Sequence, residues 1–122
     1  MKAPALSILV VEDERGIGFV VSRVLTAAGY AVQVVSSAEE ALPLLAASRA
    51  GFALLLTDLT LPGMSGRELA RRARMGQPSL RTLFVSGDAL PGDTLDECPM
   101  LAKPFTGQGL QKAVAKALAA SP

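Results

Sequence analysis

Hydrophobic residues form two patterns along this chain, and the two patterns alternate. Short continuous apolar runs end at turn residues, and they predict buried strands because they are too short to be buried helices. Stretches in which apolar residues recur every three or four positions predict amphipathic helices between the strands. The predicted strands cover residues 6–11, 30–35, 52–58, 80–86 and 100–102.

The helical stretches carry start and stop signals that fit this periodicity. The first one has a single apolar face and stops at Gly29; its members are Ile17, Val20, Val21, Val24, Leu25 and Ala28. Capping boxes predict a second helix from Ser37 to about Ser48, and a third from Ser65 to about Met75. Thr106 is the expected cap of a last helix. Pro43 should kink or loosen the second helix, because proline cannot donate a backbone hydrogen bond.

Strands that alternate with helices indicate βαβ units with parallel pairing and right-handed crossovers. We therefore expect an α/β sandwich around a central five-stranded parallel sheet, formed by one domain over residues 1–122. The connection between Ser86 and Lys103 departs from this regularity. Its prolines leave space for about one helical turn near residues 93–97, so the fourth helix should be short or absent.

Composition narrows the possible functions. The 122 residues carry a formal net charge of +1, which argues against electrostatic capture of nucleic acid or of an anionic membrane. With no histidine and only Cys98, neither an ordinary zinc site nor an internal disulfide is expected, and a redox role for this thiol is not favoured. We read no secretory signal and no membrane span, so a cytoplasmic location is expected.

Charged and hydroxyl side chains lie at the carboxyl ends of the predicted strands. Glu12 and Asp13 follow the first strand, Asp58 ends the third, Ser86 ends the fourth and Lys103 follows the last. The carboxyl ends of parallel strands meet at one edge of a sheet, which is where open α/β sheets bind their ligands. Three carboxylates gathered there would repel one another unless a cation joined them, and Mg²⁺ prefers such oxygen ligands.

This set of groups favours phosphoryl transfer. Asp58 can act as a nucleophile and form an aspartyl phosphate. The Ser86 hydroxyl and the Lys103 ammonium are the available donors to the phosphoryl oxygens.

Five segments resemble the receiver domains of two-component response regulators, and together they span nearly the whole chain. The segments are ILVVEDE at 8–14, GYAV at 29–32, LLLTDLTLPGMSGREL at 54–69, LFVSGDA at 83–89 and LAKPF at 101–105. The resemblance implies a flavodoxin-like (βα)5 sandwich with strand order 2-1-3-4-5. It also implies Mg²⁺-dependent transfer of a phosphoryl group to Asp58 from a sensor histidine kinase or a histidine phosphotransfer protein.

The resemblance further implies a role for each matching residue. Glu12 and Asp13 would be the acidic pair, with Asp13 a direct metal ligand, and Thr60 would offer its backbone carbonyl to the metal. Ser86 would take the position of the switch hydroxyl, and Lys103 that of the lysine that contacts the phosphate.

Three departures from the family pattern affect the output rather than the chemistry. Glu12 stands where many members have aspartate. Leu101 stands two residues before the lysine, where an aromatic side chain often swings inward on activation. The segment before Leu101 is also short, so the usual output face on the fourth helix is in question.

Other functions remain open at this stage. A degenerate receiver that signals by contact alone is the main alternative. A phosphatase would need a second acid where Thr60 stands, and a flavodoxin-type module would need a phosphate loop that is not acidic. We thus expect a regulatory domain rather than an enzyme. No effector sequence follows Pro122, so the response should pass to another protein or to a parent hybrid kinase.

One helix is unusually basic, with arginines that suggest an acidic partner but are more simply explained as a solvated face: Arg67, Arg71, Arg72 and Arg74.

Overall fold

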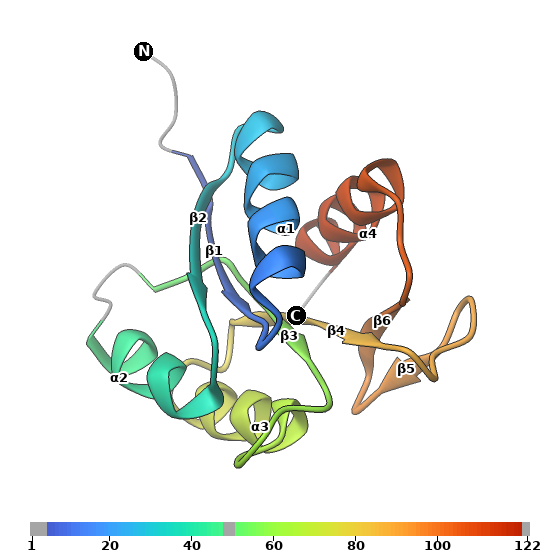
Figure 1. The fold of residues 1–122 in the computed structure, drawn as a ribbon. Helices are drawn as coiled ribbons and strands as arrows, with labels where there is room; N and C mark the ends of the chain where they lie inside the picture. Colours follow the sequence, from blue (N-terminus) through green and yellow to red (C-terminus); the bar gives the residue numbers. More distant parts are fainter. Residues whose placement is uncertain (1–4, 48–50, 121–122) are drawn as a thin grey trace.

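The computed structural model describes residues 5–47 and 51–120, which form one twisted sheet with helices on both faces (Figure 1). The strands follow the order β2-β1-β3-β4-β6-β5 across the sheet. Five of them run parallel to one another, as predicted: β1 (Ser7–Val11), β2 (Ala31–Val35), β3 (Leu54–Asp58), β4 (Arg81–Ser86) and β6 (Cys98–Ala102). The flavodoxin-like order of these five strands is therefore confirmed.

Two helices cover each face of the sheet. α1 (Arg15–Ala27) and α4 (Gly107–Ala119) contact each other on one face, whereas α2 (Ala38–Ala47) and α3 (Gly66–Gly76) contact each other on the opposite face (Figure 1). All five residues of β3 are buried, so this central strand supports both faces.

The core accordingly consists of two hydrophobic layers. Successive residues of a strand point to opposite faces, so Leu54 and Leu56 pack beneath α1 and α4 while Leu55 packs beneath α2 and α3. Complete burial of each of these leucines contributes about 2 kcal/mol to folding. This burial fixes the register of β3 and therefore the position of Asp58 at its end.

The predicted helix caps are present, with a difference in detail. The side chains of Ser37, Ser65 and Thr106 each accept a hydrogen bond from a backbone N–H three residues later. The reciprocal half of each predicted capping box is absent here, because the Glu40 carboxylate accepts from the Ser36 N–H and Glu68 binds two arginines. Pro43 lies inside α2, and the predicted end of that helix near Ser48 falls outside the described residues.

The connection between β4 and β6 contains no helix within the described chain, as the expected short or absent fourth helix allows. The prediction of five strands was wrong, however, because β5 (Thr94–Leu95) adds a sixth strand that pairs antiparallel with β6. Asp96 and Glu97 form the two-residue turn of this hairpin, with φ angles of 52° and 66°. Positive φ at both turn residues matches the backbone twist of a tight hairpin, so the chain turns back here instead of continuing a helix.

Over the described part of the chain, no helix is long and apolar enough to cross a membrane.

Candidate functional site at the carboxyl edge of the sheet

Asp58 is the last residue of β3, and the residue is almost fully buried at 8% exposure. One carboxylate oxygen, Oδ2, lies 2.6 Å from the Lys103 ammonium. The other, Oδ1, accepts a 3.0 Å hydrogen bond from the Thr60 backbone N–H. Both oxygens are thus held in fixed positions by donors from different parts of the chain.

Glu12 approaches the same lysine from the neighbouring strand. Its backbone N–H donates to the Val35 carbonyl, which keeps the chain in line as it leaves β1. Its Oε2 lies 3.2 Å from the Lys103 Nζ, and its Oε1 accepts from the Glu14 N–H at 3.2 Å. Burial raises the pKa of the Glu12 carboxyl, and the hydrogen bonds from Glu14 and Lys103 only partly oppose this shift.

Lys103 is therefore the shared partner of two buried carboxylates. Burial works to lower the pKa of this ammonium, but the hydrogen bonds to Asp58 and Glu12 outweigh burial and raise it. Lys103 consequently remains charged across the physiological pH range.

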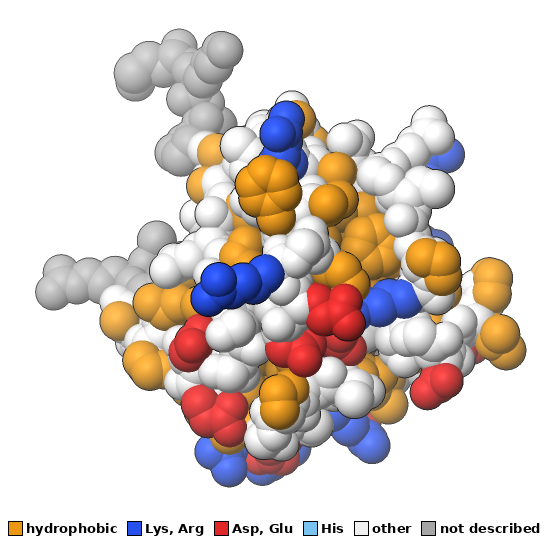
Figure 2. Space-filling model, viewed as in Figure 1, with side chains coloured by type: hydrophobic (Ala, Val, Ile, Leu, Met, Phe, Trp, Pro, Cys, Tyr) orange, Lys and Arg blue, Asp and Glu red, His pale blue; other side chains and the backbone are white. Residues whose placement is uncertain are grey.

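Asp13 completes an acidic cluster with Glu12 and Asp58. Each of the three residues offers a carboxylate oxygen, and these oxygens lie within 4.8 Å of one another. Figure 2 shows acidic side chains gathered at this rim beside a basic one, below α1. Three carboxylates facing one ammonium leave a surplus of negative charge, and their hard oxygen atoms are the ligands that Mg²⁺ prefers. The residues present therefore fit a divalent cation.

The other two predicted residues are close in the fold but differ in their contacts. Thr60 is exposed, and it contributes a backbone N–H to Asp58, as given above. Ser86 ends β4 next to β3, and its hydroxyl accepts a hydrogen bond from the Asp88 N–H at 3.1 Å. Among the described residues, no hydrogen bond joins the Ser86 side chain to Asp58 or Lys103. The sheet thus brings all the predicted residues to one edge, with Ser86 turned to its own loop.

Sequence reasoning missed two residues that position the site. Gly66, at the start of α3, has no space for a side chain, because a Cβ atom there would overlap the carbonyl oxygen of Asp58. Glu39 in α2 accepts a 3.1 Å hydrogen bond from the Met64 N–H and so holds the loop between β3 and α3. Gly66 lies within the PGMSG run of the sequence, where a second glycine so soon after Gly63 was an available signal.

Leu101 lies in β6 and is partly buried against the hydrophobic layer beneath α1 and α4. Its side chain is therefore turned toward the core, and the loss of the usual aromatic switch stays a prediction.

The doubly covered parallel sheet and its strand order define a flavodoxin-like α/β domain, and this one carries an acidic carboxyl edge with a lysine. A family model for the response regulator receiver domain matches residues 8–115. The chain therefore belongs to the family of response regulator receiver domains, and the resemblance seen in its sequence is confirmed.

The chain is also similar to individual members of this family. It is 34% identical to the response regulator receiver protein CpdR of Brucella abortus, over 93% of this chain and 98% of CpdR. A crystal structure of a response regulator receiver protein from Sinorhizobium medicae is 32% identical, with a TM-score of 0.83 over 95% of this chain and 96% of that one.

Other relatives are much longer than this chain. It is 33% identical to the response regulator protein FleR of Pseudomonas aeruginosa, matching 92% of this chain but 24% of FleR. It is 31% identical to the sensor kinase CckA of Brucella abortus, matching 92% of this chain but 12% of CckA. The receiver fold thus occurs both nearly alone and as a small part of larger regulators and kinases.

Proposed function

We propose that this receiver domain carries a phosphoryl group on Asp58 and receives it from a phosphohistidine of a sensor histidine kinase or a histidine phosphotransfer protein. The observation that supports this most strongly is the single carboxylate at the end of β3 with the Lys103 ammonium 2.6 Å away. A nucleophile beside a fixed cation is what phosphoryl transfer requires, because catalysis of this reaction is mainly positioning and charge stabilisation.

In the proposed step, a carboxylate oxygen of Asp58 forms a bond to phosphorus as the bond from phosphorus to the donor imidazole nitrogen breaks. The imidazole keeps the electron pair of that bond and leaves as neutral imidazole, because its other ring nitrogen carries a proton. Lys103 then neutralises part of the phosphoryl charge, and the Thr60 N–H continues to orient the other carboxylate oxygen. Ser86 would rotate away from Asp88 to donate to a phosphoryl oxygen.

Glu12, Asp13, Asp58 and the Thr60 carbonyl are the groups that would hold Mg²⁺. When bound, this ion supplies positive charge for the phosphoryl oxygens. Lys103 contacts both Glu12 and Asp58 and so offsets part of the negative charge of these buried carboxylates.

The donor protein would approach over α1. A hollow of about 570 Å³ opens beside Lys103 and is lined by Ile17, Val20, Pro104 and Phe105. Val20 and its neighbour Phe19 are more than half exposed, an unusual position for large apolar side chains. An apolar surface next to the reacting carboxylate can hold a partner helix while its phosphohistidine reaches Asp58.

The test is intact-mass measurement after incubation with a small acyl phosphate and Mg²⁺. We expect one added phosphate, lost in hydroxylamine as an acyl phosphate should be, and no addition in Asp58→Asn. Asp88→Asn serves as a matched control, since Asp88 is an exposed carboxylate on the loop after β4. An unchanged mass of the folded wild type, or equal phosphorylation of Asp58→Asn, would refute the proposal.

A receiver that signals by contact without phosphorylation is not favoured. Such a protein would not need the acidic residues and the lysine, yet they are present and Lys103 contacts both Glu12 and Asp58. In this proposal the chain acts as a regulatory domain, and phosphate is the product that it releases to solution.

A further inference from the structure

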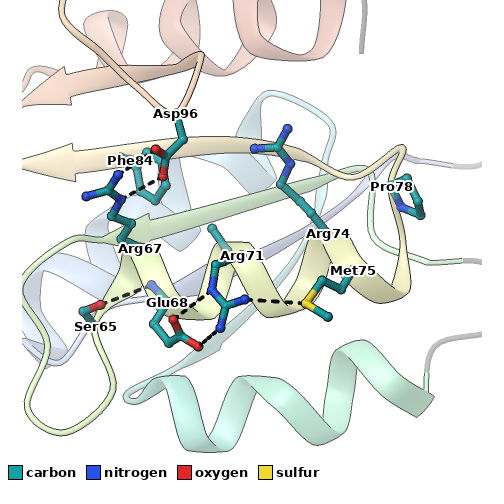
Figure 3. Close-up of a pocket in the computed structure, with 10 residues that line it drawn as sticks. Ser65, Arg67, Glu68, Arg71, Arg74, Met75, Pro78, Phe84 and Asp96 are labelled. Atoms are coloured by element: carbon teal, nitrogen blue, oxygen red, sulfur yellow. Dashed lines mark hydrogen bonds and ion pairs between the residues drawn. The ribbon is translucent and has the colours of Figure 1, made fainter.

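A hairpin, rather than a helix, connects β4 to β6, and it leaves one side of α3 uncovered. The chain passes from β4 to β6, two parallel neighbours, and Leu95 of this connection packs on the layer beneath α2 and α3. In a parallel sheet such a connection is normally a helix that covers the strands it joins. Here β5 instead pairs in the plane of the sheet, so a hollow of about 630 Å³ remains beside α3 (Figure 3).

The walls of this hollow are basic on one side and apolar at the base. Arg67, Arg71 and Arg74 project from α3. Ala70 and Phe84 lie beneath the base and are almost fully buried, so the accessible apolar surface of the base comes from Pro78. The end of the hollow is bounded by Met75, whose side chain is 73% exposed. A mixed surface of arginine and methionine side chains is typical of protein interfaces.

The arginines are only partly neutralised by the protein itself. Glu68 is shared by Arg71 and Arg72, and Asp96 binds Arg67 through two hydrogen bonds of 2.8 and 2.9 Å. The hydrogen bond of Arg74 goes to the thiol of Cys98 at 3.4 Å, not to a carboxylate. Four arginines of the helix thus face two carboxylates, in a chain whose formal net charge is only +1.

Asp96 also indicates what kind of group this surface accepts. It extends from the hairpin turn over Arg67 and places a carboxylate against a guanidinium that is otherwise exposed (Figure 3). Asp96 thus shows how a carboxylate from a segment that lies across α3 pairs with an arginine of this helix. The other arginines follow along the helix at intervals of three or four residues, and they offer similar positions for further carboxylates.

We propose that the hollow beside α3 is a docking site for an acidic amphipathic helix of a partner protein. The partner helix takes the place of a helix between β4 and β6, with its carboxylates on Arg71 and Arg74 and its apolar side on Met75 and Pro78. α3 has eleven residues and is about 16 Å long, enough for about three turns of a partner helix. This proposal rests on charge and shape at α3 and is independent of phosphorylation at Asp58.

A synthetic amphipathic peptide with glutamate along one face and leucine along the other provides the probe. In titrations of the isotopically labelled wild type, amide shifts should concentrate in residues 67–75 and 94–98, and binding should weaken as salt is added. Shifts that map to α1 or α4 instead would overturn the proposal, and this readout needs no variant.

Charge reversal with a matched control tests the same surface. Arg71→Glu with Arg74→Glu should weaken peptide binding by about tenfold or more, because attraction becomes repulsion at both contacts. Lys112→Glu with Lys116→Glu, the same charge change on exposed positions of α4, should change binding less than about twofold. Equal loss in both double variants would show that only net charge matters and would refute the site.

Two further probes separate the peptide from other anions. Polyglutamate and a short duplex DNA should bind at least about tenfold more weakly than the amphipathic peptide, since neither fills the apolar base. Tighter binding of the duplex would assign the surface to nucleic acid, and equal binding of polyglutamate would show that the apolar base is not used. Either outcome would overturn the proposal.

Discussion

The chain leaves β3 and β4 at the same rim, but the two segments that follow are held in different ways. After β3, the loop over residues 59–65 is fixed mainly through backbone atoms. Thr60 donates to Asp58, Met64 donates to Glu39, and Gly66 presses against the Asp58 carbonyl.

After β4, the segment over residues 87–97 ends in a hairpin that depends more on surface contacts. Its turn is tied to α3 by the ion pair between Arg67 and Asp96, whose side chains are 61% and 41% exposed. Exposed pairs of this kind contribute little to stability.

The difference indicates where the fold tolerates change. A carboxylate that must meet an ammonium at hydrogen-bond distance needs a backbone with little freedom, whereas a connection that only joins two strands can become a hairpin. The segment after β3 therefore holds Asp58 and Thr60 closely, whereas the segment after β4 forms a hairpin and leaves one side of α3 uncovered.

The largest effect is expected from Gly66→Ala. The added methyl group would overlap the Asp58 carbonyl, so α3 or the end of β3 must move, at a cost of about 3 kcal/mol. Urea unfolding measures this loss, and phosphorylation of Asp58 should fall with it. Gly16→Ala in α1 is the control, because nothing lies near its Cβ position and it should gain about 0.5–1 kcal/mol. If both variants were equally stable, the tight packing at Asp58 would be disproved.

Lys103→Met should have the next largest effect. It leaves Glu12 and Asp58 buried without their shared ammonium, at a cost of about 2 kcal/mol, less than for a fully buried pair because Lys103 is partly exposed. Mg²⁺ should restore part of this stability. The raised pKa of Lys103 means that its contribution is complete below pH 10.5 and is lost only as the pH rises through the higher folded-state value.

Thermal unfolding at neutral pH, with and without Mg²⁺, checks this prediction. Lys112→Met on the exposed surface of α4 should be nearly neutral. A Lys103→Met protein as stable as the wild type without divalent cations would contradict the charge balance described at the rim.

How much of this could be predicted from sequence depends on the range of the interactions involved. The apolar runs 52–58 and 80–86 fix buried strands by local pattern, so the meeting of Glu12, Asp58 and Lys103 at one edge could be deduced from topology. β5 could not be deduced in the same way. Two strand residues and a turn of Asp96 and Glu97 carry none of the glycine that usually marks a tight hairpin.

The second glycine of the PGMSG run marks Gly66 in the sequence, but its contact with Asp58 could not be deduced from that signal. It depends on the close approach of α3 to the end of β3, which is a property of tertiary packing. The same holds for the orientation of Ser86, whose hydroxyl binds the nearby Asp88 N–H rather than a group across the rim.

Glu97→Gly should stabilise the hairpin. Glu97 has a φ of 66°, a left-handed conformation that costs a non-glycine residue about 1 kcal/mol, and an Asp-Gly turn is strongly preferred at such positions. The melting temperature should rise, and amide exchange in residues 94–100 should slow. Gly92→Ala should act in the opposite direction, since Gly92 has a φ of +85°. A fall in the stability of Glu97→Gly would show that the turn is not formed as described.

The smallest effect is expected at the surface of α3. Hydrogen bonds from Arg71 and Arg72 lower the pKa of Glu68 from 4.5 to about 2. A lowered carboxyl pKa contributes stability that is present above pH 4.5 and is lost as the pH falls toward 2. Glu68→Gln should therefore be slightly less stable than the wild type at pH 7 and indistinguishable from it near pH 2, as measured by chemical unfolding. A difference that persisted at pH 2 would rule out the ion pairs as its source.

The most direct measurement of the central claim is an NMR titration with Mg²⁺ followed by beryllofluoride, a mimic of the phosphoryl group. We expect Mg²⁺ to shift the amides of Asp13, Asp58 and Thr60, and beryllofluoride then to shift those of Ser86 and Lys103 in the wild type but not in Asp58→Asn. Amides at this rim that respond to neither addition would contradict the account of Asp58 as a phosphate carrier.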